Sequence, residues 1–260
     1  MGICYTMIKI ADIKKEFEQA DEKNLLELIT QYEADERAGV KKLCTSFRKK
    51  LEKLEQEKIR LEKMCEEEAF LSEGLLVAGI DEAGRGPLAG PVVAAAVIMP
   101  KDSRLLYVND SKKLSAAKRD ELYDEIMKEA LSVGVGIISP EVIDEVNILQ
   151  ATYKAMREAV SQLNPIPEIL LNDAVIIPEL DFLQKGLIKG DARCYSIACA
   201  SIIAKVTRDR MMEEYDKLYP AYGFKSHKGY GSKEHIHALK EFGPCPIHRH
   251  SFIGNFLINE

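Results

Sequence analysis

The sequence predicts an α/β protein, a mixed β-sheet flanked by helices, preceded by a small all-helical N-terminal extension. Residues 1–73 contain no proline, one internal glycine (Gly39) and dense mixed charge, a pattern typical of helices. From Leu75 onward, short apolar runs alternate with helical patterns, which indicates strands separated by helices. We therefore divide the chain into a helical extension, residues 1–73, and a main α/β domain, residues 74–260.

The extension is predicted to form two helices, residues 11–36 and 40–71, which are broken near Gly39. Apolar residues recur there at a spacing close to a heptad, at Phe47, Leu51, Leu54, Leu61 and Cys65. Two interpretations remain open: a helical hairpin that packs on the main domain or on a partner, or an arm that grips a substrate. The hairpin is favoured, because helix faces of mixed charge are usually only solvated.

The main domain opens with two apolar runs, residues 75–80 and 90–99, which we predict to be strands. The turn between them is short, so the pair is expected to be antiparallel. Ser115 has the character of an N-cap, and a helix is predicted from it to about Ala130. Further strands are predicted at 133–138, 168–171 and 187–188, and further helices at 140–163 and 194–217.

Composition narrows the class of protein. The net charge of the chain is −6, which excludes a uniformly basic nucleic-acid binder but not a local basic surface. Between Lys185 and Arg249 the sequence has twelve Lys or Arg and seven Asp or Glu, a local net charge of +5. The six cysteines form no CxxC pair and are expected to be free thiols in a reducing compartment. No apolar run could span a membrane, so we expect a cytoplasmic protein.

Four carboxylates follow apolar segments in the main domain. Asp81 and Glu82 end the first predicted strand, Asp173 ends the fourth, and Asp191 lies in a turn before the last long helix. A buried carboxylate without a partner is costly, so several at strand ends suggest a neutralising cation. Oxygen ligands of this kind suit Mg²⁺ or Mn²⁺. For a single carboxylate a helix cap or a surface salt bridge is the usual explanation, but it fits the adjacent pair Asp81 and Glu82 less well.

Beside this pair lies Gly84-Arg85-Gly86. Glycine lets the backbone approach a ligand closely, and arginine offers a planar fork of donors suited to phosphate. A tight turn is the alternative for the three residues alone. Lys112 and Lys113 precede a predicted helix N-terminus, which is a natural phosphate site.

The basic segment adds Lys205 and Arg208, interleaved with aromatic residues such as Tyr230. Cations with aromatic rings suit phosphate backbones and stacking on sugars or bases. Histidines and a cysteine also gather near the C-terminus and could be taken for zinc ligands. Their spacing matches no standard zinc finger, so we expect His248 and Arg249 to support the loop or to contact phosphate.

The motifs resemble those of a known family. Gly79-Ile-Asp-Glu-Ala-Gly-Arg-Gly-Pro-Leu-Ala-Gly-Pro is similar to the opening of the bacterial type 2 ribonucleases H, the ribonuclease HII family. The resemblance continues in order to about Phe256 and does not cover residues 1–73. Other matching runs are Asn109-Asp-Ser-Lys-Lys-Leu, Lys189-Gly-Asp, Ala200-Ser-Ile-Ile-Ala-Lys-Val-Thr-Arg-Asp and His227-Lys-Gly-Tyr-Gly.

This resemblance implies a ribonuclease H-like fold and divalent-metal hydrolysis of RNA paired with DNA. It also implies incision 5′ of a single ribonucleotide embedded in duplex DNA, leaving 3′-hydroxyl and 5′-phosphate ends, as in ribonucleotide excision repair. The metal carboxylates of the family match Asp81, Glu82, Asp173 and Asp191, which are then the catalytic residues. Asn172 departs from the family pattern, which has an apolar residue before this third carboxylate.

The resemblance also implies how the sugar is read. The motif that recognises the 2′-hydroxyl at an RNA–DNA junction matches Gly84, Arg85 and Gly86, and the junction-sensing tyrosine matches Tyr230. Type 3 enzymes usually have lysine at the position of Arg85. The expected partners are RNA–DNA hybrids and DNA duplexes containing ribonucleotides, with no membrane, and the chain is expected to be a monomer. The alternatives are a type 3 activity limited to hybrids and a non-catalytic nucleic-acid binding module.

Overall fold

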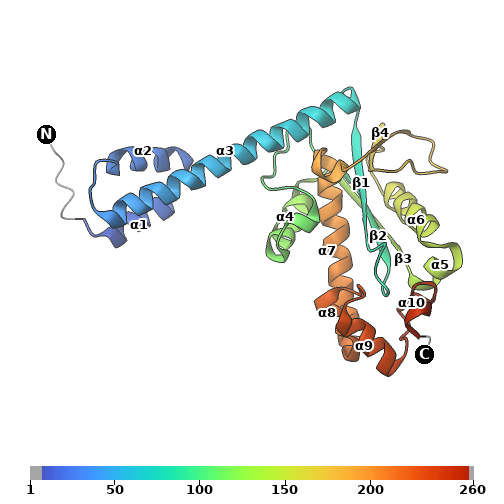
Figure 1. The fold of residues 1–260 in the computed structure, drawn as a ribbon. Helices are drawn as coiled ribbons and strands as arrows, with labels where there is room; N and C mark the ends of the chain where they lie inside the picture. Colours follow the sequence, from blue (N-terminus) through green and yellow to red (C-terminus); the bar gives the residue numbers. More distant parts are fainter. Residues whose placement is uncertain (1–7, 258–260) are drawn as a thin grey trace. The chain divides into compact units, whose positions relative to one another are not determined.

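The computed structural model describes residues 8–257, and the chain divides into two compact units. The first unit ends at Arg60 and the second begins at Leu61. Figure 1 traces the elements of both units in chain order. The unit boundary falls inside a helix, so the last turns of that helix belong to the second unit.

The first unit consists of α1 (Ile10–Gln19), α2 (Glu22–Tyr32) and the beginning of α3 (Ala38–Ser72). The predicted second helix of the extension is confirmed by α3, but the single helix predicted over residues 11–36 is wrong. The chain breaks before Glu22 because the side chain of Asp21 caps α2, accepting a hydrogen bond from the backbone N–H of Asn24 at 2.8 Å. The core of this unit is formed by Ile13, Phe17, Leu25, Ile29, Tyr32, Val40 and Cys44.

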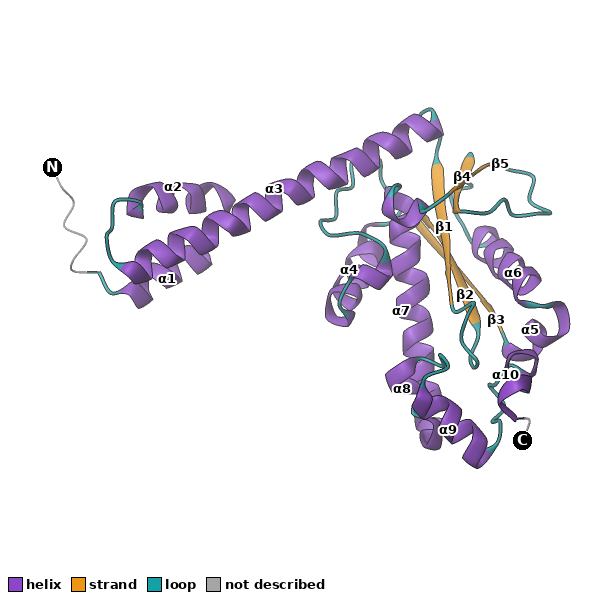
Figure 2. Ribbon diagram, viewed as in Figure 1, coloured by secondary structure: helices purple, strands orange, loops and turns teal. Residues whose placement is uncertain are grey.

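The second unit is built on a five-stranded mixed sheet in the order β3-β2-β1-β4-β5 (Figure 2). Neighbouring strands are antiparallel from β3 through β2 to β1, and parallel from β1 through β4 to β5. The predicted antiparallel pairing of the first two strands is thus confirmed. The strands are β1 (Val77–Ala83), β2 (Val92–Ile98), β3 (Ser132–Ile138), β4 (Ile169–Asp173) and β5 (Leu183–Leu187).

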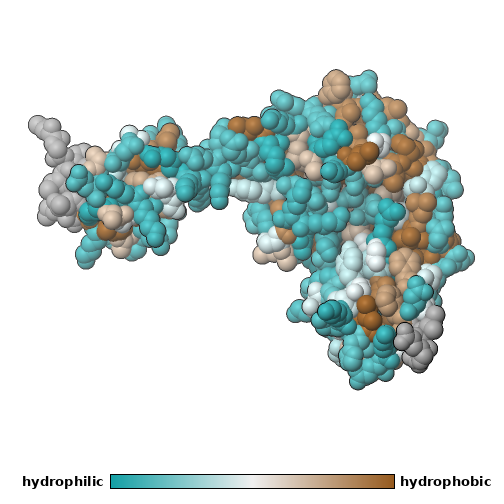
Figure 3. All heavy atoms as spheres, in the orientation of Figure 1, coloured by the Kyte–Doolittle hydropathy of each residue, from teal (hydrophilic) through white to brown (hydrophobic). Residues whose placement is uncertain are grey.

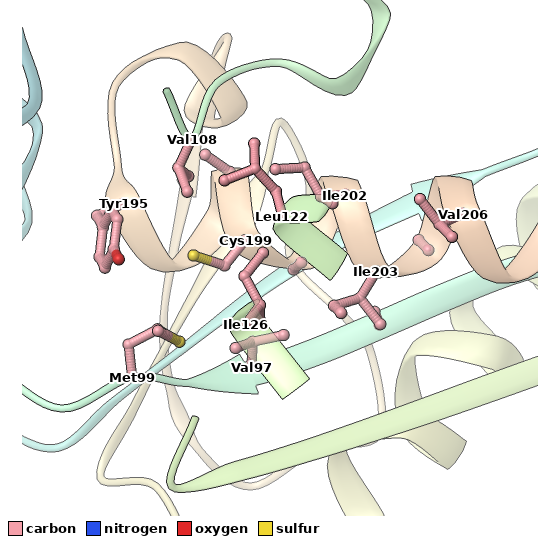
Figure 4. Close-up of a cluster of buried hydrophobic side chains, with 14 of the residues drawn as sticks. Val97, Met99, Val108, Leu122, Ile126, Tyr195, Cys199, Ile202, Ile203 and Val206 are labelled. Carbon is pink, nitrogen blue, oxygen red and sulfur yellow. The ribbon is translucent and has the colours of Figure 1, made fainter. Parts of the chain in front are cut away.

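Helices cover both faces of this sheet. On one face lie α4 (Ala116–Glu129) and α7 (Tyr195–Leu218), packed in the apolar cluster of Figure 4. On the other lie α5 (Pro140–Val146) and α6 (Ile148–Ser161). The inner strand β2 is buried along its whole length because alternate side chains face the two helical layers. Ala95 and Val97 contact the first layer, and Ala94 and Ala96 the second.

Two local features of the second unit were not expected from the sequence. The helix predicted at 140–163 is interrupted at Asn147, which has a φ of 70°. Its side chain caps α6 by accepting hydrogen bonds from the backbone N–H groups of Leu149 and Gln150. At the N-terminus of α7, the carboxylate of Glu68 accepts hydrogen bonds from the backbone N–H and the hydroxyl of Ser196, both at 2.7 Å. The last turns of α3 therefore hold the start of α7.

The C-terminal part of the second unit is helical and lies at the carboxyl end of β1. It comprises α8 (Phe224–His227), α9 (Lys233–Phe242) and α10 (His250–Leu257). Short helical turns occur at Ser111–Lys113, Gly190–Ala192 and Pro220–Tyr222. No helix within residues 8–257 has the length and apolar character needed to cross a lipid bilayer.

Candidate active site

The parallel strands bring the predicted carboxylates to one edge of the sheet. In the pairing of β1 with β4, the last partners are Ile80 and Asn172, so Asp81 and Asp173 come next on adjacent strands. Adjacent strands lie about 4.8 Å apart, which makes these two residues neighbours. Asp191 follows β5, whose last residue pairs with Asp173. The carboxyl ends of three adjacent parallel strands thus carry the four predicted residues.

The backbone around these carboxylates is held locally. Asp81 is 6% exposed, and one of its oxygens accepts the backbone N–H of Glu82 at 2.7 Å. Asp173 accepts the backbone N–H of Gly190 at 2.7 Å, which ties the end of β4 to the turn containing Asp191. Asn172, the departure from the family pattern, is fully buried, and its amide nitrogen donates to Gln184 at 3.0 Å.

Burial and mutual repulsion raise the pKa values of three of these acids. Burial is the main cause of the raised pKa of Asp81, and the charge of Glu82 adds to it. Burial likewise raises the pKa of Glu82, with a contribution from Asp173, while Arg85 acts in the opposite direction through an ion pair at 3.1 Å. The pKa of Asp191 is raised first by burial and then by the charges of Asp110 and Asp173. A cluster of this kind is strongly favourable for a cation.

The donor set fits a hard divalent ion. Oxygen Oε2 of Glu82 is buried and has no hydrogen-bond partner within the described chain, which leaves a carboxylate oxygen available for a ligand. All four side chains offer oxygen atoms only, as Mg²⁺ and Mn²⁺ prefer. Among residues 8–257, no three His, Cys, Asp or Glu side chains are already arranged as a complete metal-binding group. The carboxylates therefore fit the ion by their oxygen donors and by their shared edge of the sheet.

Asp110 is a further candidate site residue, which the sequence alone did not single out. It lies in the Asn-Asp-Ser-Lys-Lys run, and its charge raises the pKa of Asp191. Its side chain also caps the turn at Ser111–Lys113 by accepting the N–H of Lys112 at 2.9 Å. The sequence did place this aspartate within a matching motif. Its effect on Asp191, however, depends on how the strands pair, which the sequence spacing does not give.

One cleft joins the first two carboxylates to the predicted recognition residues. It has a volume of about 720 Å³ and is lined by Asp81, Glu82, Ala83, Gly84, Arg85, Gly86, Ser111, Lys112, Ile148, Ser201, Lys205, Tyr230 and Phe252. Tyr230 is 45% exposed, and a Cβ atom added to Gly86 would lie 3.9 Å from its ring. The Gly84–Gly86 turn and the tyrosine ring therefore face the same space.

The three predicted lysines differ in their surroundings. Lys112 lines the cleft, whereas the exposed Lys113 lies 3.9 Å from Asp110. Lys205 also lines the cleft, where it forms an ion pair of 2.6 Å with Asp209, and burial lowers its pKa. Lys112 and Lys205 thus both line the cleft, and Lys205 would have to exchange its ion pair with Asp209 to bind a ligand there.

Arg208 occupies a different place from the one expected. Its side chain is fully buried, and its guanidinium group donates to the backbone carbonyls of Pro91, Lys228 and Ala89 at 2.9–3.0 Å. Burial lowers its pKa to about 10. The expected phosphate contact from Arg208 is therefore not supported, because its donors are used inside the protein. A Cβ atom at Gly84, which has a φ of 93°, would lie 2.1 Å from Nε of Arg208, so this position requires glycine.

Arg249 is a second buried arginine behind the same turn. It donates to the carbonyls of Gly84, Arg85, Gly90 and Pro91 at 2.6–3.2 Å, and none of its side chain is exposed. Burial lowers its pKa to about 9. Of the two roles expected for Arg249, support of the loop is the one that fits these contacts. Two guanidinium groups therefore fix the backbone that carries the Gly-Arg-Gly motif.

A chain of hydrogen bonds fixes the backbone of Tyr230. The N–H of Cys245 donates to Nδ1 of His248 at 2.9 Å, so the proton of His248 is on Nε2. That nitrogen donates to Nε2 of His235 at 3.0 Å, and Nδ1 of His235 donates to the carbonyl of Tyr230 at 2.8 Å. Burial lowers the pKa of both histidines, to about 4 for His248. His248 is 1% exposed, so it supports the loop and does not contact solvent.

Comparison with known proteins identifies the family of this chain. The family model described as "Ribonuclease HII" matches residues 78–255, and the model described as "Ribonuclease HII N-terminal domain" matches residues 9–71. The chain is 56% identical over 248 residues to ribonuclease HII of Lachnoclostridium phytofermentans, covering 95% of this chain and 98% of the relative. It is 50% identical over 250 residues to ribonuclease HII of Clostridioides difficile, covering 95% and 98%.

Solved structures agree with this assignment. The crystal structure of ribonuclease H2 from Pyrococcus horikoshii matches with a TM-score of 0.59 at 28% identity, covering 70% of this chain and 96% of that one. Ribonuclease HII in the PCNA:RNase HII complex of Archaeoglobus fulgidus matches with a TM-score of 0.59 at 32% identity, covering 71% and 98%.

The mixed sheet, its two helical layers and these structural neighbours define the class of protein as ribonuclease H-like. The relatives are ribonucleases HII, so this protein is an endoribonuclease of the ribonuclease H type. The chain belongs to the ribonuclease HII family.

Proposed function

We propose that this protein is a divalent-metal-dependent endoribonuclease that acts on the RNA strand of RNA–DNA hybrids and incises 5′ of single ribonucleotides embedded in duplex DNA. It would work as a monomer in the cytoplasm, in the removal of ribonucleotides from DNA. The observation that carries the proposal is the single cleft of about 720 Å³, which is lined by Asp81 and Glu82, by the Gly84–Gly86 turn, and by Tyr230. Carboxylates for catalysis and groups able to read a sugar share one space.

Asp81, Glu82, Asp173 and Asp191 would hold one or two Mg²⁺ or Mn²⁺ ions. When bound, such ions activate a water molecule for attack on phosphorus and stabilise the leaving 3′-oxygen. The protein's own contribution is to gather these acids in a buried site, where their raised pKa values make a cation favourable, and to fix their positions through the backbone contacts of Asp81 and Asp173. The products would carry 3′-hydroxyl and 5′-phosphate ends.

Recognition of the ribonucleotide would come from the turn beside the metal ligands. The 2′-hydroxyl is the one group that separates RNA from DNA at a single nucleotide. Backbone groups of Gly84–Gly86 can hydrogen-bond it because no side chain at either glycine blocks the approach. The ring of Tyr230 can stack on the next sugar and would favour deoxyribose, since a 2′-hydroxyl would crowd the ring. Lys112, Lys113 and Lys205 would contact phosphates.

The test is cleavage of a DNA duplex carrying one ribonucleotide, beside an all-RNA/DNA hybrid, with Mg²⁺, with Mn²⁺ and with chelator. We expect metal-dependent incision on the 5′ side of the ribonucleotide and cleavage of the hybrid. Cleavage of the hybrid alone would refute the junction-reading role of Arg85 and Tyr230. Binding of both substrates without any cleavage would refute the enzymatic proposal in favour of a binding module.

A variant of one ligand tests the assignment of the carboxylates. Asp191→Asn keeps the shape of the side chain and removes its charge. Residues that only support a metal ligand cost about 10–100-fold in activity when changed, so loss of a ligand should exceed a hundredfold. Binding of the duplex should be largely retained. An Asp191→Asn enzyme that keeps most of its activity would contradict the metal role.

A further inference from the structure

The first unit carries a concentrated positive charge that the active site does not use. Between Arg37 and Lys53 the sequence has seven Lys or Arg and one acidic residue, Glu52, a net charge of +6 in a chain whose total is −6. Most of this segment lies in the first half of α3. Two of its cations are neutralised by ion pairs: Arg37 with Asp35 at 2.6 Å, and Arg48 with Glu33 at 3.0 Å.

Three lysines of the segment form one exposed row, which we call the basic stripe: Lys42, Lys49 and Lys53. The core-facing side of α3 is set by Val40 and Cys44, which pack against α1 and α2. At 100° per residue, the three lysines lie on the opposite side of the helix. Within residues 8–257 none of the three forms an ion pair. The exposed Ser46 and Gln56 share this side and add neutral hydrogen-bonding groups.

The length of the stripe suits a nucleic-acid duplex. Lys42 and Lys53 are eleven residues apart, which corresponds to about 16 Å along a helix axis. A DNA duplex presents one phosphate per about 1.7 Å of its axis, so a row of this length faces several phosphates. Hydrophilic side chains dominate the surface of the first unit in Figure 3. The stripe therefore offers charge without apolar anchors.

A lipid surface fits this helix less well. Basic helices that bind membranes insert a free apolar face beneath the head groups. The apolar face of α3 in the first unit is already covered, because Val40, Cys44, Phe47 and Leu51 pack in the core formed with α1 and α2. The partner of the stripe is therefore one recognised through charge and hydrogen bonds alone. A phosphate backbone has this chemistry, and the proposed substrate of this protein supplies one.

We propose that the basic stripe of the first unit is a second nucleic-acid contact, which binds the sugar–phosphate backbone of duplex substrate without reading its sequence. A second weak contact on the same chain raises the overall affinity because it acts at a high effective concentration. This inference rests on the proposed nucleic-acid substrate, but it concerns binding and does not require cleavage.

The experiment measures binding of the full-length protein, in chelator, to a fluorescent 30-base-pair DNA duplex without ribonucleotides and to the same duplex with one ribonucleotide. The test variant is Lys42→Gln/Lys49→Gln/Lys53→Gln. The matched control is Lys14→Gln/Lys15→Gln/Lys23→Gln, which removes three exposed lysines from the same unit. A third variant with arginine at the three stripe positions keeps the charge.

Each neutralised phosphate contributes about 0.9 to the slope of log K against log salt concentration. The test variant should therefore lower that slope by about 2–3 on both duplexes, while the control and the arginine variant retain the slope of the unchanged protein. In cleavage assays, KM should rise with kcat unchanged, since none of the three lysines lines the cleft.

Two results would overturn the proposal. The first is a slope that changes equally in the test variant and the control, which would mean that the stripe is only a solvated helix face. The second is unchanged DNA binding together with loss of self-association or of binding to an acidic protein. If the protein bound both duplexes through the stripe and cleaved neither substrate, the contact would stand and the proposed catalytic function would fall.

Discussion

Replacing Arg249 with lysine should destabilise the second unit and weaken recognition of the ribonucleotide together. The guanidinium group donates five hydrogen bonds to the carbonyls of Gly84, Arg85, Gly90 and Pro91. Lysine keeps the positive charge but carries its donors on a single nitrogen at the end of a flexible stem. The substitution therefore tests geometry at constant charge.

The expected loss of stability follows from the carbonyls left without a donor. An ammonium group cannot reach all of these acceptors, so about two buried carbonyls lose their partner, at roughly 1–3 kcal/mol each. The sum is about 4 kcal/mol, a large part of the 5–15 kcal/mol of a typical native protein. For a unit of this size about 1 kcal/mol shifts Tm by roughly 2–4 °C, so Tm should fall by roughly 8–16 °C.

The cleavage activity should fall together with the stability. If the turn loses its fixed position, one hydrogen bond to the 2′-hydroxyl is weakened, worth about 1–1.5 kcal/mol or roughly tenfold in rate. The kcat/KM for the single-ribonucleotide duplex and that for the hybrid should therefore each fall about tenfold, because the nucleotide at the cut carries a 2′-hydroxyl in both substrates. Thermal unfolding followed by circular dichroism and the two cleavage assays supply both numbers.

Arg210→Lys is the matched control, because Arg210 is exposed and its 3.0 Å contact with Asp120 lies at the surface. A surface pair of this kind is worth at most about 1 kcal/mol. An Arg249→Lys protein with the Tm and the kcat/KM values of the control would refute the positioning role of Arg249.

Three further predictions test other parts of the unit. Tyr230→Ala should reduce cleavage of the single-ribonucleotide duplex more than cleavage of the hybrid, and equal losses would contradict a sensing role for the ring. His248 has a pKa lowered from 6.5 to about 4 by burial, so its contribution to stability is complete above pH 6.5 and is lost as the pH falls toward 4. In that interval it lowers the free energy of unfolding by up to about 1.4 kcal/mol per pH unit. His248→Gln should therefore flatten the fall of Tm with pH, and an unchanged fall would refute the assignment. Gly79→Ala would bring a Cβ atom to 2.1 Å from the backbone of Ser196 and should lower the free energy of unfolding by at least about 1–3 kcal/mol. The control is Gly254→Ala, where the added Cβ atom would have no other atom within 4 Å and should be neutral or stabilising.

The strand-end carboxylates could be predicted because their signal is local. Asp81 and Glu82 follow a short apolar run directly, and such a run, bounded by a glycine-rich turn, is typical of a buried strand. Helix starts with a capping residue were equally clear, as at Ser115, which accepts the N–H of Lys118 at 3.3 Å. The breaks at Asp21 and Asn147 were missed, although both residues are good caps, because helical patterns continue on each side of them.

The sequence by itself determined the residue types of the cleft and the elements that carry them: acids at strand ends and glycines in the turn that follows the first strand. Only the tertiary structure decided which polar groups are buried and what they bond. Arg249 meets Gly84 across 165 positions of the chain, and the charge of Asp110 acts on Asp191 from a distant loop. The reason is physical: the cost of burying a charge and the donors that offset it depend on neighbours brought together by the sheet, and sequence spacing does not encode that distance.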